Sequence, residues 1–305
     1  MLNILGKRYY FFALSLLIIV PGLIVMAIWG LPLAIDFQGG TLMEVSFASG
    51  NIPTTADVVQ IYTEAGINDP QVQTTSQNTL QVRSSFLDDA MRSTLLNAMS
   101  TKFNDSVELV RYDSVGPTIG REVTSRAAMA VGVAALAVIL YITYAFRGIP
   151  HALRYGICAI LAMLHDVLVV ISLAAIGGKF FGWQVDSLFL TALLTVIGFS
   201  TQDKIVVFDR IRENSNIYRR LPFEKLANHS IVQTLQRSIN TQLMTVEFML
   251  LALALFGGVT LREFAVILLV GLLSGTYSSI FIAAPALVLW ENREWKTWFK
   301  RGAAA

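Results

Sequence analysis

Six ionisable side chains lie within, or at the edge of, stretches of this chain that are otherwise apolar: His165, Asp166, Asp203, Lys204, Arg237 and Glu247. A charge at the centre of a membrane helix costs about 2.5–3.5 kcal/mol on insertion scales. Carrying several such charges without a role would be expensive, so a path for protons or ions is the default interpretation. By this argument Asp166, midway along its stretch, is a candidate relay residue together with Asp203.

Other kinds of chemistry find no support in the sequence. It contains no P-loop, HExxH, GxSxG or CxxC pattern, so neither nucleotide hydrolysis nor a peptidase mechanism is indicated. The single cysteine, Cys158, lies in an apolar run and predicts neither a disulfide nor a cysteine metal cluster. We therefore expect a protein that is not an enzyme and holds no cofactor or metal, with protons as its coupling ion.

The composition indicates that membrane helices position these residues. The chain has 305 residues, of which 54% are hydrophobic and 14% charged, whereas a soluble domain carries about 25% charged residues. This balance excludes a soluble enzyme, a disordered protein and a nucleic-acid binder. A span needs about 20 mostly apolar residues. Six stretches meet that need: 9–35, 127–146, 155–178, 188–208, 238–261 and 264–290.

The short segments between these stretches predict the orientation. Thirteen Lys and Arg residues fall on one side, whereas Lys179 and Arg262 are the two in the short loops of the other. Positive residues are enriched on the cytoplasmic side of membrane proteins. We therefore expect residues 1–35 to form a cytoplasmic N-terminus and the first span. Residues 123–292 would hold the other five spans with a polar cytoplasmic loop at 210–236, and residues 293–305 a cytoplasmic tail.

Residues 36–122 have a different character and predict a small extracytoplasmic domain between the first two spans. Strand-like patterns occur at 41–47, 70–75, 79–84 and 106–114, with helical stretches at 54–65 and 85–103. Thr54 with Asp57 and Ser85 with Asp88 are typical of helix N-terminal capping boxes. The order βαββαβ predicts an α+β domain of the ferredoxin-like kind, a module reused for binding or for spacing.

The intramembrane charges also have structural explanations. Lys204 could extend to the cytoplasmic surface, or pair with Glu247, which lies about one turn deeper on another helix; we favour this ion pair. Arg237 is a flanking residue if its helix begins at Ser238. It lies at the depth of Asp203 if the helix begins two turns earlier. His165 could simply hydrogen-bond a backbone carbonyl.

Several motifs together resemble a known family, that of SecD and SecF in the bacterial Sec protein translocase, and within it the SecF half. The similarity covers nearly the whole chain, and the motifs occur in the family's order. They are Asp36 to Gly40 (DFQGG), residues 115–120 (VGPTIG, with Gly116 and Pro117), His165–Asp166, residues 197–214 (IGFSTQDKIVVFDRIREN) and residues 237–241 (RSINT). Gly39 and Gly40 are expected to have a backbone role, not a binding role, because glycine can adopt the positive φ that a turn from the first span into a strand requires.

The resemblance implies fold, partners and site. It implies an RND-superfamily half-bundle of six membrane helices that pairs with SecD in the bacterial cytoplasmic (inner) membrane. It further implies contacts with the SecYEG translocon, with YajC and YidC, with the translocating unfolded polypeptide and with membrane lipid. The implied role is to use the proton gradient to promote polypeptide export. The implied proton path runs through Asp203, Arg237 and Thr241, with another acid supplied by SecD.

Two positions depart from the family pattern, and two other functions stay open. The family usually has threonine where this chain has Lys204, and an apolar residue near Glu247. A structural scaffold of the translocase, without its own proton relay, is one alternative function. An RND exporter half for lipids or small molecules is the other.

Overall fold

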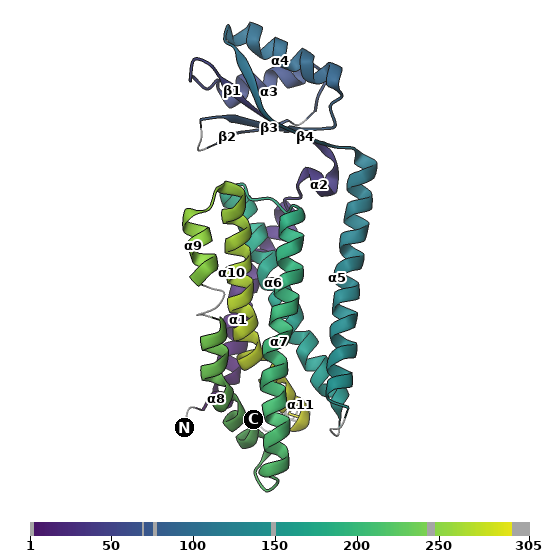
Figure 1. The fold of residues 1–305 in the computed structure, drawn as a ribbon, viewed down its shortest axis with the longest axis vertical. Helices are drawn as coiled ribbons and strands as arrows, with labels where there is room; N and C mark the ends of the chain where they lie inside the picture. Colours follow the sequence, from purple (N-terminus) through teal and green to yellow (C-terminus); the bar gives the residue numbers. More distant parts are fainter. Residues whose placement is uncertain (1–2, 69, 76–77, 148–150, 243–247, 295–305) are drawn as a thin grey trace, which may run out of the picture. The chain divides into compact units, whose positions relative to one another are not determined.

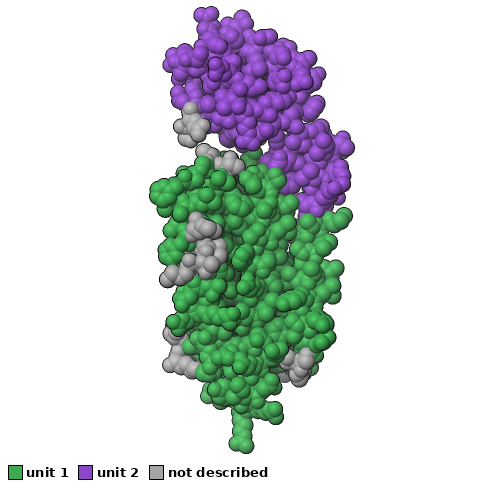
Figure 2. Space-filling view, in the orientation of Figure 1, with its two compact units in different colours: residues 1–32, 129–305 green, residues 33–128 purple. Residues whose placement is uncertain are grey.

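The computed structural model describes residues 3–68, 70–75, 78–147, 151–242 and 248–294. The chain divides into two compact units, coloured separately in Figure 2. One consists of residues 33–128, and the other of residues 1–32 and 129–305.

The smaller unit is an α+β domain built on one sheet. Its elements are β1 (Gly40–Phe47), α3 (Thr55–Glu64), β2 (Gln71–Thr74), β3 (Leu80–Ser84), α4 (Asp89–Phe103) and β4 (Val107–Val115). The sheet order is β2-β3-β1-β4, and all three pairings are antiparallel. Both helices lie on one face of the sheet (Figure 1). The strands and helices expected from the sequence thus occur in the expected order.

A single core holds this unit together. Alternating strand residues such as Met43, Val45 and Val82 point to the helices and pack with Tyr62 and Leu95, all of them at most 1% exposed. Such alternation buries one face of a strand and leaves the other to solvent. The sheet therefore presents its apolar face to α3 and α4.

The N-terminal cap predicted from the sequence is confirmed at α3 and is wrong at α4. The Thr54 hydroxyl accepts a hydrogen bond from the Asp57 amide, as the capping pattern predicts. At α4 the cap is Asp88, whose carboxylate accepts from the Met91 amide, and the expected cap Ser85 lies outside the helix. The backbone amide of Leu87 instead donates to the Thr41 hydroxyl at 2.9 Å. That bond ties the segment before α4 to β1 and delays the helix start.

The larger unit is helical. Its elements are η1 (Leu5–Lys7), α1 (Arg8–Trp29), the second part of α5 (Pro117–Ala145), α6 (Ala152–Phe181), α7 (Ser187–Ile217), α8 (Phe223–Gln242), α9 (Phe248–Phe256), α10 (Val259–Ser278), the π-helical turn η3 (Ser279–Ala283) and α11 (Ala284–Glu291). A further short helix, α2 (Ile35–Gln38), belongs to the smaller unit.

Five helical stretches in the described residues are long and apolar enough to cross a membrane: Leu5–Trp29, Pro117–Ala145, Ala152–Phe181, Ser187–Ile217 and Leu261–Glu291. The sixth expected span, 238–261, includes residues 243–247, which lie outside the described residues. The segment 210–236, expected as a polar loop, is helical for most of its length, because α7 continues to Ile217 and α8 begins at Phe223.

Close helix contacts position the functional residues. Helix α1 packs against α6, and α10 packs against both α6 and α7 (Figure 1). Small residues allow this proximity: a Cβ at Gly271 of α10 would stand 2.3 Å from a Val196 methyl of α7. Pro285, which lacks an amide hydrogen, lies just after the π turn that links α10 to α11. Helices α6, α7 and α10 therefore form one packed core.

Candidate functional site

Asp166 of α6 is the most heavily hydrogen-bonded acid in the helical unit's described core. It is 1% exposed. Five donors surround its carboxylate: His165 Nδ1 (3.1 Å) and Ser274 Oγ (2.7 Å) at Oδ1, and Lys204 Nζ (2.9 Å), Ser278 Oγ (2.7 Å) and Ser200 Oγ at Oδ2. These donors come from α6, α7 and α10, so the carboxylate joins three helices.

Lys204 of α7 is the counter-charge of Asp166. Its side chain is fully buried, and its ammonium forms an ion pair with Asp166 Oδ2 at 2.9 Å. It also donates to the backbone oxygen of Ser200 at 3.1 Å and to the Ser200 hydroxyl. The interpretation that Lys204 extends to the cytoplasmic surface is therefore wrong, because a closer partner lies within the bundle. The favoured partner, Glu247, lies outside the described residues, so that pair stays a prediction.

Asp203 adjoins Lys204 in sequence but has different surroundings. It is 6% exposed, and its Oδ2 accepts hydrogen bonds from Gln242 Nε2 of α8 and Thr276 Oγ1 of α10, both at 3.1 Å. Within the part of the chain that the structure describes, no donor reaches its Oδ1. Asp203 is thus a buried carboxyl with hydrogen-bonding capacity left over.

Arg237 and Thr241 of α8 lie on an exposed face of the helix. Their spacing of four residues places them on one side of it, as expected. In the described part of the chain Arg237 makes no ion pair with Asp203, and Gln242 of the same helix contacts that acid instead. The structure therefore places Arg237 at the surface of this chain.

His165 contacts the acid beside it and an aromatic ring. Its Nδ1 hydrogen-bonds Asp166, so the suggested backbone-carbonyl role is wrong. Its ring stacks on Tyr277 of α10, with ring centroids 6.0 Å apart. Tyr277 in turn donates to the backbone oxygen of Phe11 in α1 at 2.7 Å. His165 thus extends the polar core of α6 and α10 toward α1.

The two glycine-containing motifs meet in the smaller unit. Gly39 has φ +77°, and a Cβ there would stand 2.7 Å from the Pro117 Cα at the start of α5. Gly40 has φ +131°, and its Cβ would stand 2.7 Å from the backbone oxygen of Ser84. A residue with a side chain tolerates neither the conformation nor the contact. Asp36 lies in α2, one turn before this joint, and Gly116 immediately precedes α5. These residues fix how the domain's first and last segments meet.

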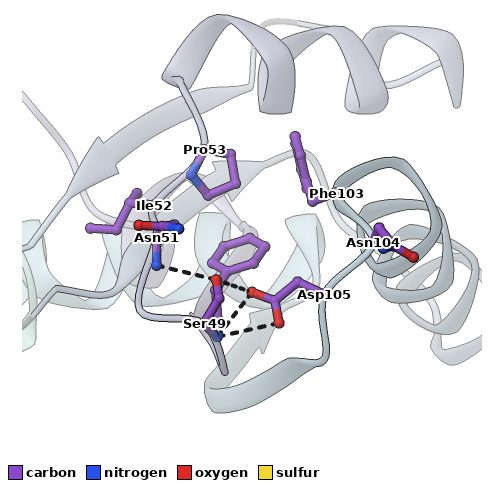
Figure 3. Close-up of a pocket in the computed structure, with 8 residues that line it drawn as sticks. Ser49, Asn51, Ile52, Pro53, Phe103, Asn104 and Asp105 are labelled. Carbon is purple, nitrogen blue, oxygen red and sulfur yellow. Dashed lines mark hydrogen bonds between the residues drawn. The ribbon is translucent and has the colours of Figure 1, made fainter.

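The smaller unit also contains a pocket of about 340 Å³, drawn in Figure 3. It is lined by Phe47, Ser49, Asn51, Ile52, Pro53, Phe103, Asn104 and Asp105. The Ser49 hydroxyl and then the backbone amides of Ser49 and Ser106 hydrogen-bond the Asp105 carboxylate and hold its pKa below the usual range. The acid thereby closes a loop and does not point a free charge into the pocket.

Residues that the sequence analysis did not single out complete both acid sites. They are Ser200, Gln242, Ser274, Thr276 and Ser278. One signal was present: Ser200 and Lys204, like Ser274 and Ser278, are four residues apart and so share a helix face. Serine is common in membrane helices as a packing residue, which hid this signal.

The chain matches two family models. One, described as Protein export membrane protein SecD/SecF, C-terminal, matches residues 95–293. The other, described as SecD/SecF GG Motif, matches residues 24–50 and so includes Gly39 and Gly40. Together the two matches include both glycine-containing motifs and both acid sites.

Relatives and a solved structure agree with these models. The Protein translocase subunit SecF of Anaerolinea thermophila is 72% identical over 99% of this chain and 98% of its own length. That of Thermobaculum terrenum is 47% identical over 99% of this chain and 98% of its own. The crystal structure of SecDF from Thermus thermophilus, described as a translocon-associated membrane protein, matches with a TM-score of 0.81 and 34% identity. That match covers 96% of this chain and 39% of the SecDF chain. The chain therefore belongs to the SecD/SecF family of protein-export membrane proteins, in its SecF branch.

Proposed function

We propose that this chain, together with a SecD-type partner, uses the proton gradient to promote export of polypeptides across the bacterial cytoplasmic membrane. The observation that carries the proposal is Asp203. It is a buried carboxyl whose Oδ2 has two neutral donors and whose Oδ1 has none among the described residues. Because no cation is paired with it there, it can bind a proton without losing an ion pair. Protons are thus the coupling ion that we propose.

The exposed position of Arg237 supports a partner that carries an acid. An arginine on the outer face of a membrane helix is costly unless a neighbouring protein or water covers it. The solved SecDF structure has a longer chain, and the match covers 39% of it. We propose that a SecD-type half supplies an acid opposite Arg237 and Thr241. The SecYEG translocon, YajC, YidC and the translocating chain are proposed further contacts.

The membrane arrangement belongs to the same proposal. The apolar helix α9 packs against α10, so α9 and the end of α8 are suited to form the sixth span at 238–261. Both termini then lie in the cytoplasm, and the smaller unit, as a ferredoxin-like domain, lies outside. Its net charge of −5 over residues 36–126, from eleven acids and six basic residues, is consistent with the side that carries few positive charges.

Substitution of Asp203 tests the proposal. Asp203→Asn keeps both hydrogen-bonded contacts possible but removes the exchangeable proton. We expect normal abundance and complex assembly, with the export rate lowered at least tenfold and its dependence on the proton gradient lost. Asp209→Asn, an exposed carboxylate on the same helix, is the matched control and should leave export unchanged.

The same experiment separates the two alternatives from the proposal. A structural scaffold predicts that Asp203→Asn assembles and exports like the wild type. An exporter of lipids or small molecules predicts that polypeptide export is unaffected, whereas efflux of such a compound is lost. Either result would contradict the proposed function.

A further inference from the structure

The starting point is the number of donors at Asp166. An ionised carboxylate offers about four lone-pair sites, and five donors crowd around this one. A proton on either oxygen would have to displace a donor that is already in place. Asp166 therefore differs from Asp203, whose Oδ1 has no donor among the described residues.

Lys204 is equally saturated. An ammonium has three N–H groups, and the Lys204 ammonium contacts three oxygens: Asp166 Oδ2, Ser200 O and Ser200 Oγ. The pair carries no net charge, and neither side chain is more than 1% exposed. Removing one partner of a buried ion pair leaves the other charge uncompensated, which is strongly destabilising.

Helix geometry keeps Lys204 away from Asp203. Consecutive residues of an α-helix point about 100° apart, so Lys204 faces α6 while Asp203 faces Gln242 of α8 and Thr276 of α10. Among the described residues, the other titratable groups near Asp166 are His165, which bonds it, and Tyr277, which stacks on that histidine. Among the described residues, Lys204 is the lysine or arginine that forms an ion pair with Asp166.

We propose that Lys204 is a positioning residue that keeps Asp166 permanently ionised and outside proton exchange, which leaves Asp203 as the proton-binding carboxyl among the described residues of this core. The inference rests on the proposed function for the role of Asp203. Its claim about Asp166 concerns the charge state of the folded protein and stands apart from export. It also removes Asp166 from the relay in which the sequence analysis placed it.

The first test measures the unfolding midpoint of the full chain in detergent between pH 5 and pH 8. Lys204→Met removes the cation and nearly preserves the length of the side chain. Asp166 must then bind a proton to stay buried, and the unfolded chain releases that proton. Stability therefore falls as pH rises, by up to tenfold in the folding equilibrium constant per pH unit. The difference in midpoint between wild type and variant should widen over this range.

Two further variants keep the test decisive. In the double variant Lys204→Met with Asp166→Asn no charge remains at the pair, so its difference from wild type should not change with pH. If Lys204→Met alone does not fold, the double variant is measured in its place. Lys225→Met, at an exposed lysine of α8, is the matched control and should show no such trend. A pH-independent difference for Lys204→Met would overturn the inference.

The second test is export by the double variant. If Asp166 takes no part in proton exchange, Lys204→Met with Asp166→Asn should export with the pH profile of the wild type, within about threefold in rate. A folded double variant that has lost export, or whose pH profile is shifted, would place Asp166 in the proton path. If Asp203→Asn exports normally, the proposed function fails, whereas the unfolding measurement still decides the state of Asp166.

Discussion

Replacing Gly22 of α1 by alanine should separate α1 from α6. Gly22 is buried against Ser172, whose hydroxyl donates to the backbone oxygen of Ile19 at 3.1 Å. A Cβ at Gly22 would stand 2.2 Å from the Ser172 Cβ and 2.5 Å from its Cα. One of these two atoms belongs to the backbone of α6, so a rotamer change cannot relieve the overlap.

The size of the effect follows from these distances. Carbon atoms pack at roughly 3.5–4.0 Å, so the helices must move apart by about 1.3 Å or more at this point. Overpacking of this kind costs about 1–3 kcal/mol, and we expect the upper half of that range because the backbone is involved. For a chain of this size, with an unfolding entropy of about 2.1 cal/mol/K per residue, about 2–3 kcal/mol corresponds to a midpoint roughly 3–5 °C lower.

The assay is thermal unfolding of the purified full chain in detergent, followed by loss of helical circular dichroism. The matched control is Gly132→Ala in α5, where a Cβ would meet nothing within 4 Å. There the substitution should leave the midpoint unchanged or raise it slightly, because alanine favours helix by up to about 1 kcal/mol over glycine. If Gly22→Ala unfolds at the same temperature as Gly132→Ala, the tight α1–α6 contact described above is incorrect.

Two further predictions concern the smaller unit. Gly40→Val should lower the abundance of the full chain several-fold, because φ +131° and the 2.7 Å approach to Ser84 exclude a side chain; immunoblotting of membranes measures this, and wild-type abundance would contradict it. Residues 33–128 expressed alone should unfold in one cooperative transition. In that fragment the Ser49–Asp105 hydrogen bonds lower the folded-state pKa of Asp105, so their stabilisation is present above pH about 4 and is lost as pH falls through the folded-state value. Circular dichroism melts should therefore show Ser49→Ala destabilised at pH 6 and little different from wild type near pH 2; an unchanged difference would refute the assignment.

Local patterns predicted much of the fold because their causes are local. Strand alternation and the cap at Thr54 depend on neighbouring residues. The cap occurs as expected, and β1 alternates over residues 43–47, whereas residues 40–43 are all buried. The start of α4 depended instead on a bond between Leu87 and Thr41, 46 residues apart. The continuation of α7 to Ile217 was missed because its polar residues suggested a loop, whereas a helix that leaves the membrane can remain a helix in water.

The candidate site shows the same division. Hydropathy correctly indicated four buried side chains, because a charge within a long apolar run is visible in the sequence: His165, Asp166, Asp203 and Lys204. It did not show that Arg237, at the edge of such a run, is exposed. The pairing of Lys204 with Asp166 was not visible, because helix rotation and packing decide which neighbouring side chain a buried lysine meets. Ser274 reaches Asp166 from 108 residues away. The polar environment of each acid therefore depends on tertiary packing, so local sequence patterns do not predict it.

The Asp166–Lys204 pair has a consequence for biogenesis. Its two members lie on consecutive membrane helices, 38 residues apart, whereas Ser274 and Ser278 follow on a helix synthesised later. During synthesis α6 and α7 can therefore enter the bilayer as a hairpin in which the two charges already neutralise each other. A lone aspartate or lysine would oppose entry of its helix into the bilayer by about 2.5–3.5 kcal/mol. Entry of both helices together as a hairpin avoids burying either charge without its partner. The order of helices along the chain thus lets the membrane accept the acid before the serines that complete its site have been made.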